Sequence, residues 1–142
     1  MMTNSEQWMF SYQERVNSVL DDLLPKEKTK LVDAMRYSVL NGGKRLRPIL
    51  VYLASGLGEA SKEAQDSIAC SIELIHCYSL IHDDLPAMDD DALRRGKPTC
   101  HKEFGEDIAI LAGDAIQPLA YSLITDCPSI EESKKVQLIS LL

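Results

Sequence analysis

Apolar residues along this chain recur at intervals of three and four positions, which is the spacing of an α-helix that buries one face. One such stripe runs over residues 16–24, and a second runs over residues 31–39 and ends at a turn with two glycines, residues 41–43. Pro48 suits the first turn of a helix, so a third helix is expected over residues 48–57. No segment has the period of two that strands require, and the pattern therefore predicts an all-α protein.

The longest helical pattern begins after Ser61, whose hydroxyl is a suitable N-cap, and leads into a run of aspartates. Residue 64 is alanine rather than glutamate, so no capping box is expected. Short connections favour antiparallel neighbours, and we expect residues 1–142 to form one antiparallel helical bundle. The elements expected beyond the aspartates are a polar loop over 92–102, a helix over 105–125 and a last helix from Ile130 onward.

Composition limits the classes of protein to which this chain can belong. It has 142 residues and a net charge of −7, which argues against binding to nucleic acids or anionic membranes. It begins without a basic segment followed by an apolar stretch, and no uninterrupted apolar run reaches the roughly 18 residues that span a membrane. The four cysteines form no C-x-x-C pair and are expected to be reduced, buried thiols. We therefore expect a cytoplasmic protein with no membrane span.

Five aspartates fall within nine residues, and their surroundings suggest more than a solvated face. Apolar residues 85–88 interrupt the run, and basic residues follow it. Like charges this close repel unless cations lie between them, and ligands that are all oxygen suit Mg²⁺ or Mn²⁺ rather than Zn²⁺. An EF-hand is excluded, because a loop beginning at Asp83 would place Leu85 third and no glycine sixth. A generic acidic calcium-binding helical domain is an alternative, but it gives the basic residues no role.

The spacing within the aspartate run has a structural consequence. Asp83 and Asp89 are six residues apart, which would separate them by about 120° around a straight helix. Pro86 lies between them, donates no helical hydrogen bond, and clashes with the carbonyl of His82. We therefore predict an unwound turn over residues 85–88 that brings Asp89 round towards Asp83.

A second group of charged residues can bind an anion without a metal. Residues 42–48, GGKRLRP, combine flexible glycines, three cations and the start of a helix. A basic loop that only caps a helix would look the same, and a lone histidine is usually a packed one. His76, however, lies seven residues before Asp83, on nearly the same helix face. Arg94 and Arg95 add a basic patch beyond the aspartates. These groups predict two diphosphates, one held through a metal and the other by cations.

Three motifs together resemble one protein family. GGKRLRP at 42–48, SLIHDDLPAMDDD at 79–91 and LRRGKPTCHKEFGEDIAILAGDA at 93–115 are similar to the trans-polyprenyl synthases, and among them to bacterial-type farnesyl diphosphate synthases. The similarity extends over about residues 32–126. It implies an isoprenoid-synthase-like helical fold, a homodimer in the full-length form, and prenyl transfer from dimethylallyl or geranyl diphosphate to isopentenyl diphosphate in isoprenoid biosynthesis. A farnesyl product is expected first and a geranylgeranyl product second.

The resemblance also implies roles for individual residues. Tyr78 resembles the aromatic residue that limits product length in short-chain members, although core packing would also explain it. Ser79 lies one turn below Asp83. The resemblance assigns catalysis and Mg²⁺ ligation, with Mn²⁺ as a substitute, to Asp83, Asp84 and Asp89, contact with the allylic diphosphate to Arg94, and the isopentenyl diphosphate pocket to Lys44, Arg47, His76 and Arg95.

Members of this family are longer and carry a second aspartate-rich motif. No further D-D-x-x-D follows Asp126, and the apolar residues 136–142 carry no helix-ending signal. We therefore expect this chain to be the N-terminal portion of such an enzyme and to lack part of the active site. The alternative is a non-catalytic helical half that binds a partner chain.

Overall fold

The computed structural model describes residues 4–142, which form seven helices and one two-stranded antiparallel hairpin. The all-α prediction is therefore confirmed for the described part of the chain. In chain order the helices are α1 (Asn4–Leu23), α2 (Lys30–Leu40), α3 (Leu46–Ser55), α4 (Lys62–Asp83), α5 (Cys100–Phe104), α6 (Glu106–Thr125) and α7 (Glu132–Ile139), and the strands are β1 (Leu93–Arg94) and β2 (Lys97–Pro98).

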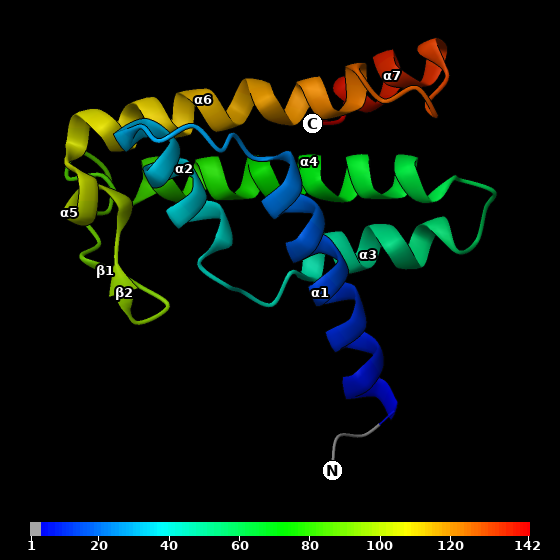
Figure 1. Ribbon diagram of the computed structural model, residues 1–142, viewed down its shortest axis with the longest axis horizontal. Coiled ribbons are helices and arrows are strands. Elements are labelled where there is room, and N and C mark those ends of the chain that lie inside the picture. Colours follow the sequence, from blue (N-terminus) through cyan, green and yellow to red (C-terminus); the bar gives the residue numbers. More distant parts are fainter. Residues whose placement is uncertain (1–3) are drawn as a thin grey trace.

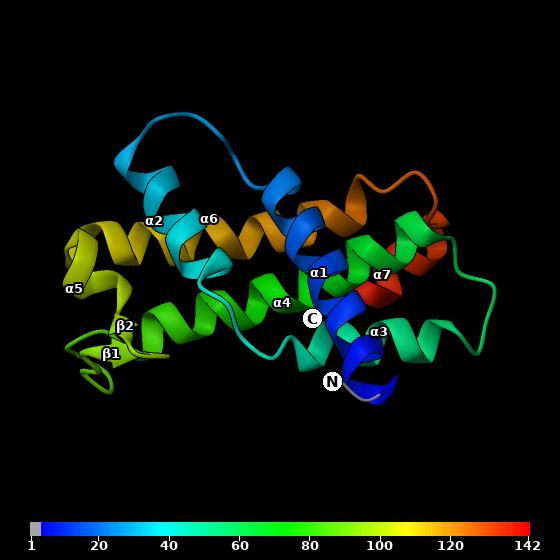
Figure 2. The same ribbon diagram turned by 60° about the horizontal axis from the view of Figure 1, so that its bottom comes forward.

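Helices α4 and α6 run side by side in opposite directions through the middle of the molecule, as Figures 1 and 2 show. Helix α3 packs against α4, α2 packs mainly against α6, and α1 crosses to contact α2, α3 and α4. The hairpin and α5 lie at the end of the bundle where α4 finishes and α6 begins (Figure 1). This end of α4 carries the aspartates, so the fold places Arg94 of the hairpin beside them.

Small residues allow α4 and α6 to approach closely. At Gly113 of α6, an added Cβ would lie 2.2 Å from Nε2 of His82, so the histidine ring occupies the space that a side chain would need. The Ser71 hydroxyl donates a hydrogen bond to the carbonyl of Ala120, at 2.7 Å, across the same interface. The buried residues that the two helices contribute to the core are Ala69, Cys70, Leu74, Cys77, Ile81, Ala109, Ala112, Ile116 and Ala120.

Several local predictions are confirmed. The Ser61 side chain caps α4 by accepting a hydrogen bond from the backbone N–H of Ala64, at 3.2 Å. The predicted helix over 105–125 corresponds to α6, with Gly105 as its N-cap. All four cysteines are buried free thiols, as expected.

Other boundaries differ from the predictions. Helix α3 begins at Leu46 rather than Pro48, because Arg45 takes a left-handed conformation, φ 50°, and starts the helix there. The region predicted as a loop over 92–102 contains β1, β2 and the first residues of α5. Its turn is made by Arg95 and Gly96, whose φ values of 54° and 77° are those of a tight hairpin turn. The last helix begins at Glu132 rather than Ile130, because Ile130 is buried in a small cluster with Ile124 and Cys127.

Within residues 4–142, helix α6 has the length and apolar composition that a membrane-crossing helix needs, although no uninterrupted apolar run of that length is visible in the sequence. A helix at the centre of a folded core meets the same criteria. Helix α6 packs along α4 and buries Ala109, Ala112 and Ile116 in the core.

Candidate functional site

The aspartate run forms a tight turn at the end of α4. The helix ends at Asp83, and Asp84 still donates its backbone N–H to the carbonyl of Leu80, at 3.1 Å. The chain then reverses, so that the backbone N–H of Asp89 donates to the carbonyl of Asp83, at 2.8 Å. The predicted unwound turn after Asp84 is confirmed, and it places Asp89 directly beside Asp83. Pro86 accounts for the break, because it can neither donate a helical hydrogen bond nor fit against the preceding turn.

Asp84 faces a different partner from its neighbours. Its side chain is buried, with 3% of the residue exposed, whereas Asp83 is only half-buried and Asp89 is exposed. Both Asp84 oxygens accept hydrogen bonds from Arg94, at 2.5 Å from Nη2 and at 2.9 and 3.1 Å from Nε. The pKa of the Arg94 guanidinium is raised, first by this hydrogen bonding to Asp84. Asp84 is therefore the anchor of Arg94 in this structure.

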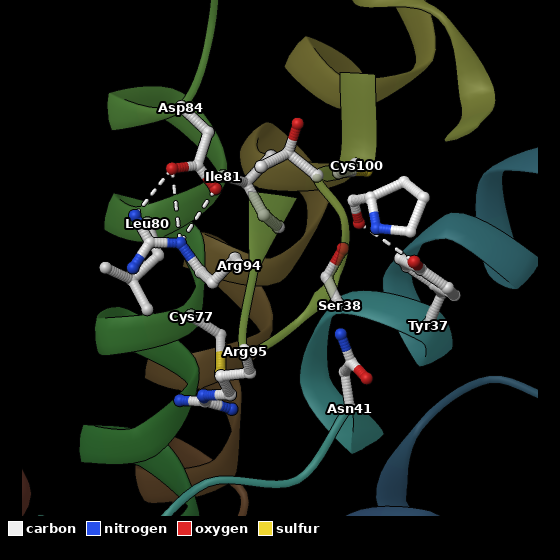
Figure 3. A pocket seen from close by; sticks show the side chains of 12 residues that line it. Tyr37, Ser38, Asn41, Cys77, Leu80, Ile81, Asp84, Arg94, Arg95 and Cys100 are labelled. Carbon is white, nitrogen blue, oxygen red and sulfur yellow. Dashed lines mark hydrogen bonds and ion pairs between the residues drawn. The ribbon is translucent and has the colours of Figure 1, made fainter. Parts of the chain in front are cut away.

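A small cavity lies beside this ion pair. Figure 3 shows Asp84 and Arg94 joined on one side of it, with Tyr37 and Ser38 of α2 and its C-cap residue Asn41 on the other. The cavity has a volume of about 30 Å³, which is room for one or two water molecules and too little for a diphosphate. Across residues 4–142, no three histidine, cysteine, aspartate or glutamate side chains are gathered as a metal-binding group. The structure thus brings Asp83 and Asp89 together but leaves Asp84 apart from them.

The four residues predicted for a metal-free anion pocket line one groove of about 530 Å³. Lys44 comes from the connection between α2 and α3, Arg47 from the first turn of α3, His76 from α4, and Arg95 from the hairpin turn. Residues that come from different segments are between 19 and 51 positions apart in the sequence. Only the packing of the hairpin and the loop against α4 therefore brings them together. The structure brings the four side chains to one groove, and their role in binding an anion stays a prediction.

Arg95 reaches this groove by lying on the backbone of Gly43. Its guanidinium donates a hydrogen bond to the carbonyl of Gly42. A Cβ added at Gly43 would lie 2.6 Å from the guanidinium carbon, so any side chain there would displace Arg95. Gly43 also has a φ of 124°, which side chains rarely adopt.

Replacing Gly43 with alanine is expected to move the Arg95 guanidinium out of the groove and to weaken diphosphate binding about tenfold, the effect of losing roughly 1.4 kcal/mol. Gly42→Ala is the matched control, because Gly42 has a φ of 75° but open space around its Cβ position. Calorimetric titration with inorganic diphosphate measures both variants. Equal losses in the two variants would attribute the effect to backbone strain rather than to Arg95.

Arg45 also lines this groove, but it is not a third available cation of GGKRLRP. Only 2% of the residue is exposed, and its guanidinium Nη1 donates to Oε1 of Glu73 at 2.8 Å. Glu73, a second lining residue, is itself buried and was not visible as a functional residue in the sequence, since a single glutamate on a helix carries no signal of its partner. Lys44 and Arg47 are therefore exposed to the groove, whereas the charge of Arg45 is paired with Glu73 in its wall.

His76 is held in its neutral form by its surroundings. Burial lowers its pKa below the ordinary value of 6.5, and the positive charges of Arg47, Arg95 and Arg94 lower it further, while Glu73 acts in the opposite direction. A neutral imidazole still donates one hydrogen bond. An anion in the groove would offset the arginine charges and so favour protonation of His76.

Diphosphate binding is therefore expected to be coupled to proton uptake by His76, and affinity should rise as the pH falls below 6.5. The stability of the protein without the anion depends on pH in the opposite direction. Folding lowers the His76 pKa, so the free energy of unfolding decreases as the pH falls from 6.5 towards the folded-state pKa. Calorimetry in buffers of different ionisation enthalpy measures the proton uptake, and His76→Gln subtracts the protons taken up by diphosphate itself. Identical proton uptake in this variant would contradict the assignment.

An apolar groove continues along α4 below the aspartates. It has a volume of about 350 Å³ and is lined by Arg47, His76, Ser79, two isoleucines of α4, and Leu141 and Leu142 from the end of the chain. Tyr78 points elsewhere, because its ring packs edge-on against His82 with centroids 5.4 Å apart, and His82 Nε2 lies 3.1 Å from the Ile110 carbonyl of α6. Ser79 therefore lines this groove directly, whereas Tyr78 does not line it and packs against His82 instead.

Comparison with known proteins agrees with this arrangement. A family model described as polyprenyl synthetase matches residues 28–142. The chain belongs to the polyprenyl synthetase family. A solved structure of a family member, an FPP/GFPP synthase from Zymomonas mobilis, is 40% identical and superimposes with a TM-score of 0.90, covering 96% of this chain and 51% of that one. The predicted isoprenoid-synthase fold is thus confirmed.

Other polyprenyl synthetases are similar over nearly all of this chain. Farnesyl diphosphate synthase of Haemophilus influenzae is 50% identical over 133 residues, covering 92% of this chain and 45% of the relative. The large subunit 1 of the chloroplastic heterodimeric geranylgeranyl pyrophosphate synthase of Arabidopsis thaliana is 46% identical over 133 residues. This match covers 93% of this chain and 36% of the relative. The chain thus spans less than half the length of these relatives, as the missing second aspartate-rich motif predicts.

Proposed function

We propose that this chain supplies one wall of the active site of a trans-prenyltransferase that joins an allylic diphosphate to isopentenyl diphosphate and forms farnesyl diphosphate. The observation that carries the proposal is the convergence of Lys44, Arg47, His76 and Arg95 on one groove beside α4. His76 and Asp83 are seven residues apart on that helix, so the groove and the aspartate turn share one helix face. The names of two similar proteins, the FPP/GFPP synthase of Zymomonas mobilis and the farnesyl diphosphate synthase of Haemophilus influenzae, support the same reaction.

Asp83 and Asp89 are the carboxylates that fit a magnesium ion. The Asp89 N–H to Asp83 carbonyl hydrogen bond holds the two residues adjacent, Asp89 is exposed and Asp83 is half-buried, and Mg²⁺ and Mn²⁺ prefer oxygen ligands. Asp84 fits this role less well, because Arg94 engages both of its oxygens; its proposed role is to hold Arg94 towards the allylic diphosphate. When bound, magnesium supplies positive charge that stabilises the departing diphosphate.

The remaining residues hold and orient the second substrate. Lys44, Arg47, Arg95 and His76 bind the diphosphate of isopentenyl diphosphate through charge and hydrogen bonds, with no metal required. The C–O bond of the allylic diphosphate breaks, the double bond of isopentenyl diphosphate forms the new C–C bond, and the proton lost from that unit leaves with the released diphosphate. The apolar groove beside Ser79 accepts the growing hydrocarbon chain.

Titration of the 142-residue chain with inorganic diphosphate, with and without Mg²⁺, tests the two-site arrangement. One site is expected without Mg²⁺ and two with it. Lys44→Ala/Arg47→Ala should remove only the metal-independent site, and Lys28→Ala/Lys134→Ala, which removes the same charge from exposed positions elsewhere, should remove neither. A wild-type chain that binds no diphosphate in either condition would refute the proposal.

Product length is proposed to depend on Ser79 and Tyr78. Ser79→Phe should shorten the product, because the larger side chain fills the apolar groove one turn below Asp83. Tyr78→Ala should lengthen it, because removing a ring that packs against the core beside Ser79 opens space into which the hydrocarbon chain can extend. Chromatography of the products made from geranyl and isopentenyl diphosphates measures both changes. An unchanged product in both variants would remove these residues from length control.

Two alternatives to a farnesyl product made by this chain alone follow from its similarity to one relative. Similarity to the Arabidopsis thaliana large subunit favours a geranylgeranyl product, or a chain that works beside a second subunit, as the second candidate.

Self-association into a homodimer is supported by Ile110 and Leu111, which α6 leaves exposed. The four free thiols fit a reducing compartment, which supports the cytoplasm as the site of action. Sedimentation analysis of the purified chain tests the homodimer.

A further inference from the structure

Arg45 ties three helices together from inside the protein. Its Nη1 donates to Glu73 on α4 at 2.8 Å, its Nε donates to Oδ1 of Asn17 on α1 at 2.9 Å, and its Nη2 donates to the carbonyl of Val39 on α2 at 2.7 Å. A guanidinium has five donors in a fixed plane, so three bonds in different directions fix its position closely. Arg45 and Glu73 are each only 2% exposed, and the pair is therefore an internal tie rather than a surface contact.

The backbone at Arg45 decides which side chains of the loop face outward. Its left-handed conformation, φ 50°, turns this side chain into the protein while Lys44 and Arg47 on either side remain exposed. A second bond from α1 reinforces the loop, since Gln13 Nε2 donates to the carbonyl of Lys44 at 3.0 Å. A left-handed non-glycine residue is unfavourable by itself, so the contacts of the buried side chain must hold it in place.

Glu73 links this loop to the histidine of the groove. It lies three residues before His76 on α4, so one turn of one helix carries both the carboxylate that holds Arg45 and the imidazole that faces the groove. The separation between His76 and the two exposed cations then depends on the Arg45–Glu73 bond. A buried ion pair adds little net stability compared with a well-packed apolar pair. The benefit of this pair therefore lies in where it places the loop.

We propose that Arg45 and Glu73, which form part of the wall of this groove, are a positioning pair that sets its geometry through the bonds of Arg45 to three helices. The consequence for diphosphate binding rests on the proposed function, whereas the effect on loop geometry does not. Glu73 also pairs with the charge of Arg45, so the cations left to bind a ligand are Lys44, Arg47 and Arg95.

The test compares the removal of two different ion pairs, each of which has its carboxylate on α4. Arg45→Met/Glu73→Leu replaces the positioning pair with apolar residues and avoids leaving one charge buried alone. Arg15→Met/Asp66→Asn is the matched control, because Arg15 on α1 and Asp66 on α4 form an ion pair at 2.8 Å outside the groove. Hydrogen exchange of amides 42–47 measures loop geometry, and titration with inorganic diphosphate measures binding.

The first double variant is expected to exchange amides 42–47 at least about tenfold faster and to bind diphosphate about tenfold more weakly, while the control changes neither. Asn17→Ala, which removes one partner of Arg45 and leaves the charge pair intact, is a milder second variant and should give a smaller change in the same direction. Unchanged exchange and affinity in folded Arg45→Met/Glu73→Leu would overturn the proposal. Faster exchange in a chain whose wild type binds no diphosphate would support the positioning pair and refute the proposed function instead.

Discussion

Replacing Asp83 and Asp89 together with asparagine is expected to lower the rate of prenyl transfer at least about 1,000-fold, which corresponds to roughly 4 kcal/mol of lost transition-state stabilisation. The two residues lie side by side because the chain turns back after α4 and the backbone of Asp89 bonds to that of Asp83. Asparagine keeps the shape and one oxygen of each side chain but removes the negative charges that favour a divalent cation.

The measurement is formation of farnesyl diphosphate from geranyl and isopentenyl diphosphates, together with Mg²⁺-dependent binding of inorganic diphosphate. Asp91→Asn is the control, because Asp91 is an exposed member of the same aspartate run, 3.7 Å from Arg94. Asp84→Asn separates the two roles proposed within the run: it should weaken binding of the allylic diphosphate by loosening Arg94 while leaving the Mg²⁺ dependence unchanged. Loss of Mg²⁺ dependence in Asp84→Asn would make Asp84 a metal ligand after all.

Removing Arg45 alone is expected to give the largest loss of stability. In Arg45→Met, the Glu73 carboxylate remains buried without the guanidinium that lies 2.8 Å away, and breaking one half of a buried ion pair costs about 3–5 kcal/mol. This is a large part of the roughly 5–15 kcal/mol that stabilises a typical domain, so the variant should unfold at markedly lower urea concentration.

Arg15→Met is the matched control for this loss. Its ion pair with Asp66 is partly exposed, and removing such a pair should cost about 1 kcal/mol or less. Urea unfolding followed by circular dichroism measures both variants. If Arg45→Met and Arg15→Met lost equal stability, Glu73 would have to be solvated or otherwise partnered in the folded protein.

Helix starts and stops could be predicted wherever the deciding interaction is local. Ser61 caps α4 through a residue three positions away, and Pro86 breaks the helix through its own ring. The hairpin was missed because its turn is made by Arg95 and Gly96, and arginine is an unusual residue in a left-handed conformation. That conformation depends on the contact of Arg95 with Gly43, which lies 52 residues earlier in the chain.

The sequence by itself determined the helical class, the family, the aspartate turn and the set of cations, because spacing, proline sterics and motif order are properties of short segments. Only the tertiary structure decided which charged residues face the site. Arg45 looks equivalent to Lys44 and Arg47 in the sequence, yet Glu73 draws it inside. Asp84 looks equivalent to Asp83, yet Arg94 engages it. In both cases an oppositely charged residue from another segment satisfies a side chain that burial would otherwise leave unpaired, and a buried charge requires such a partner.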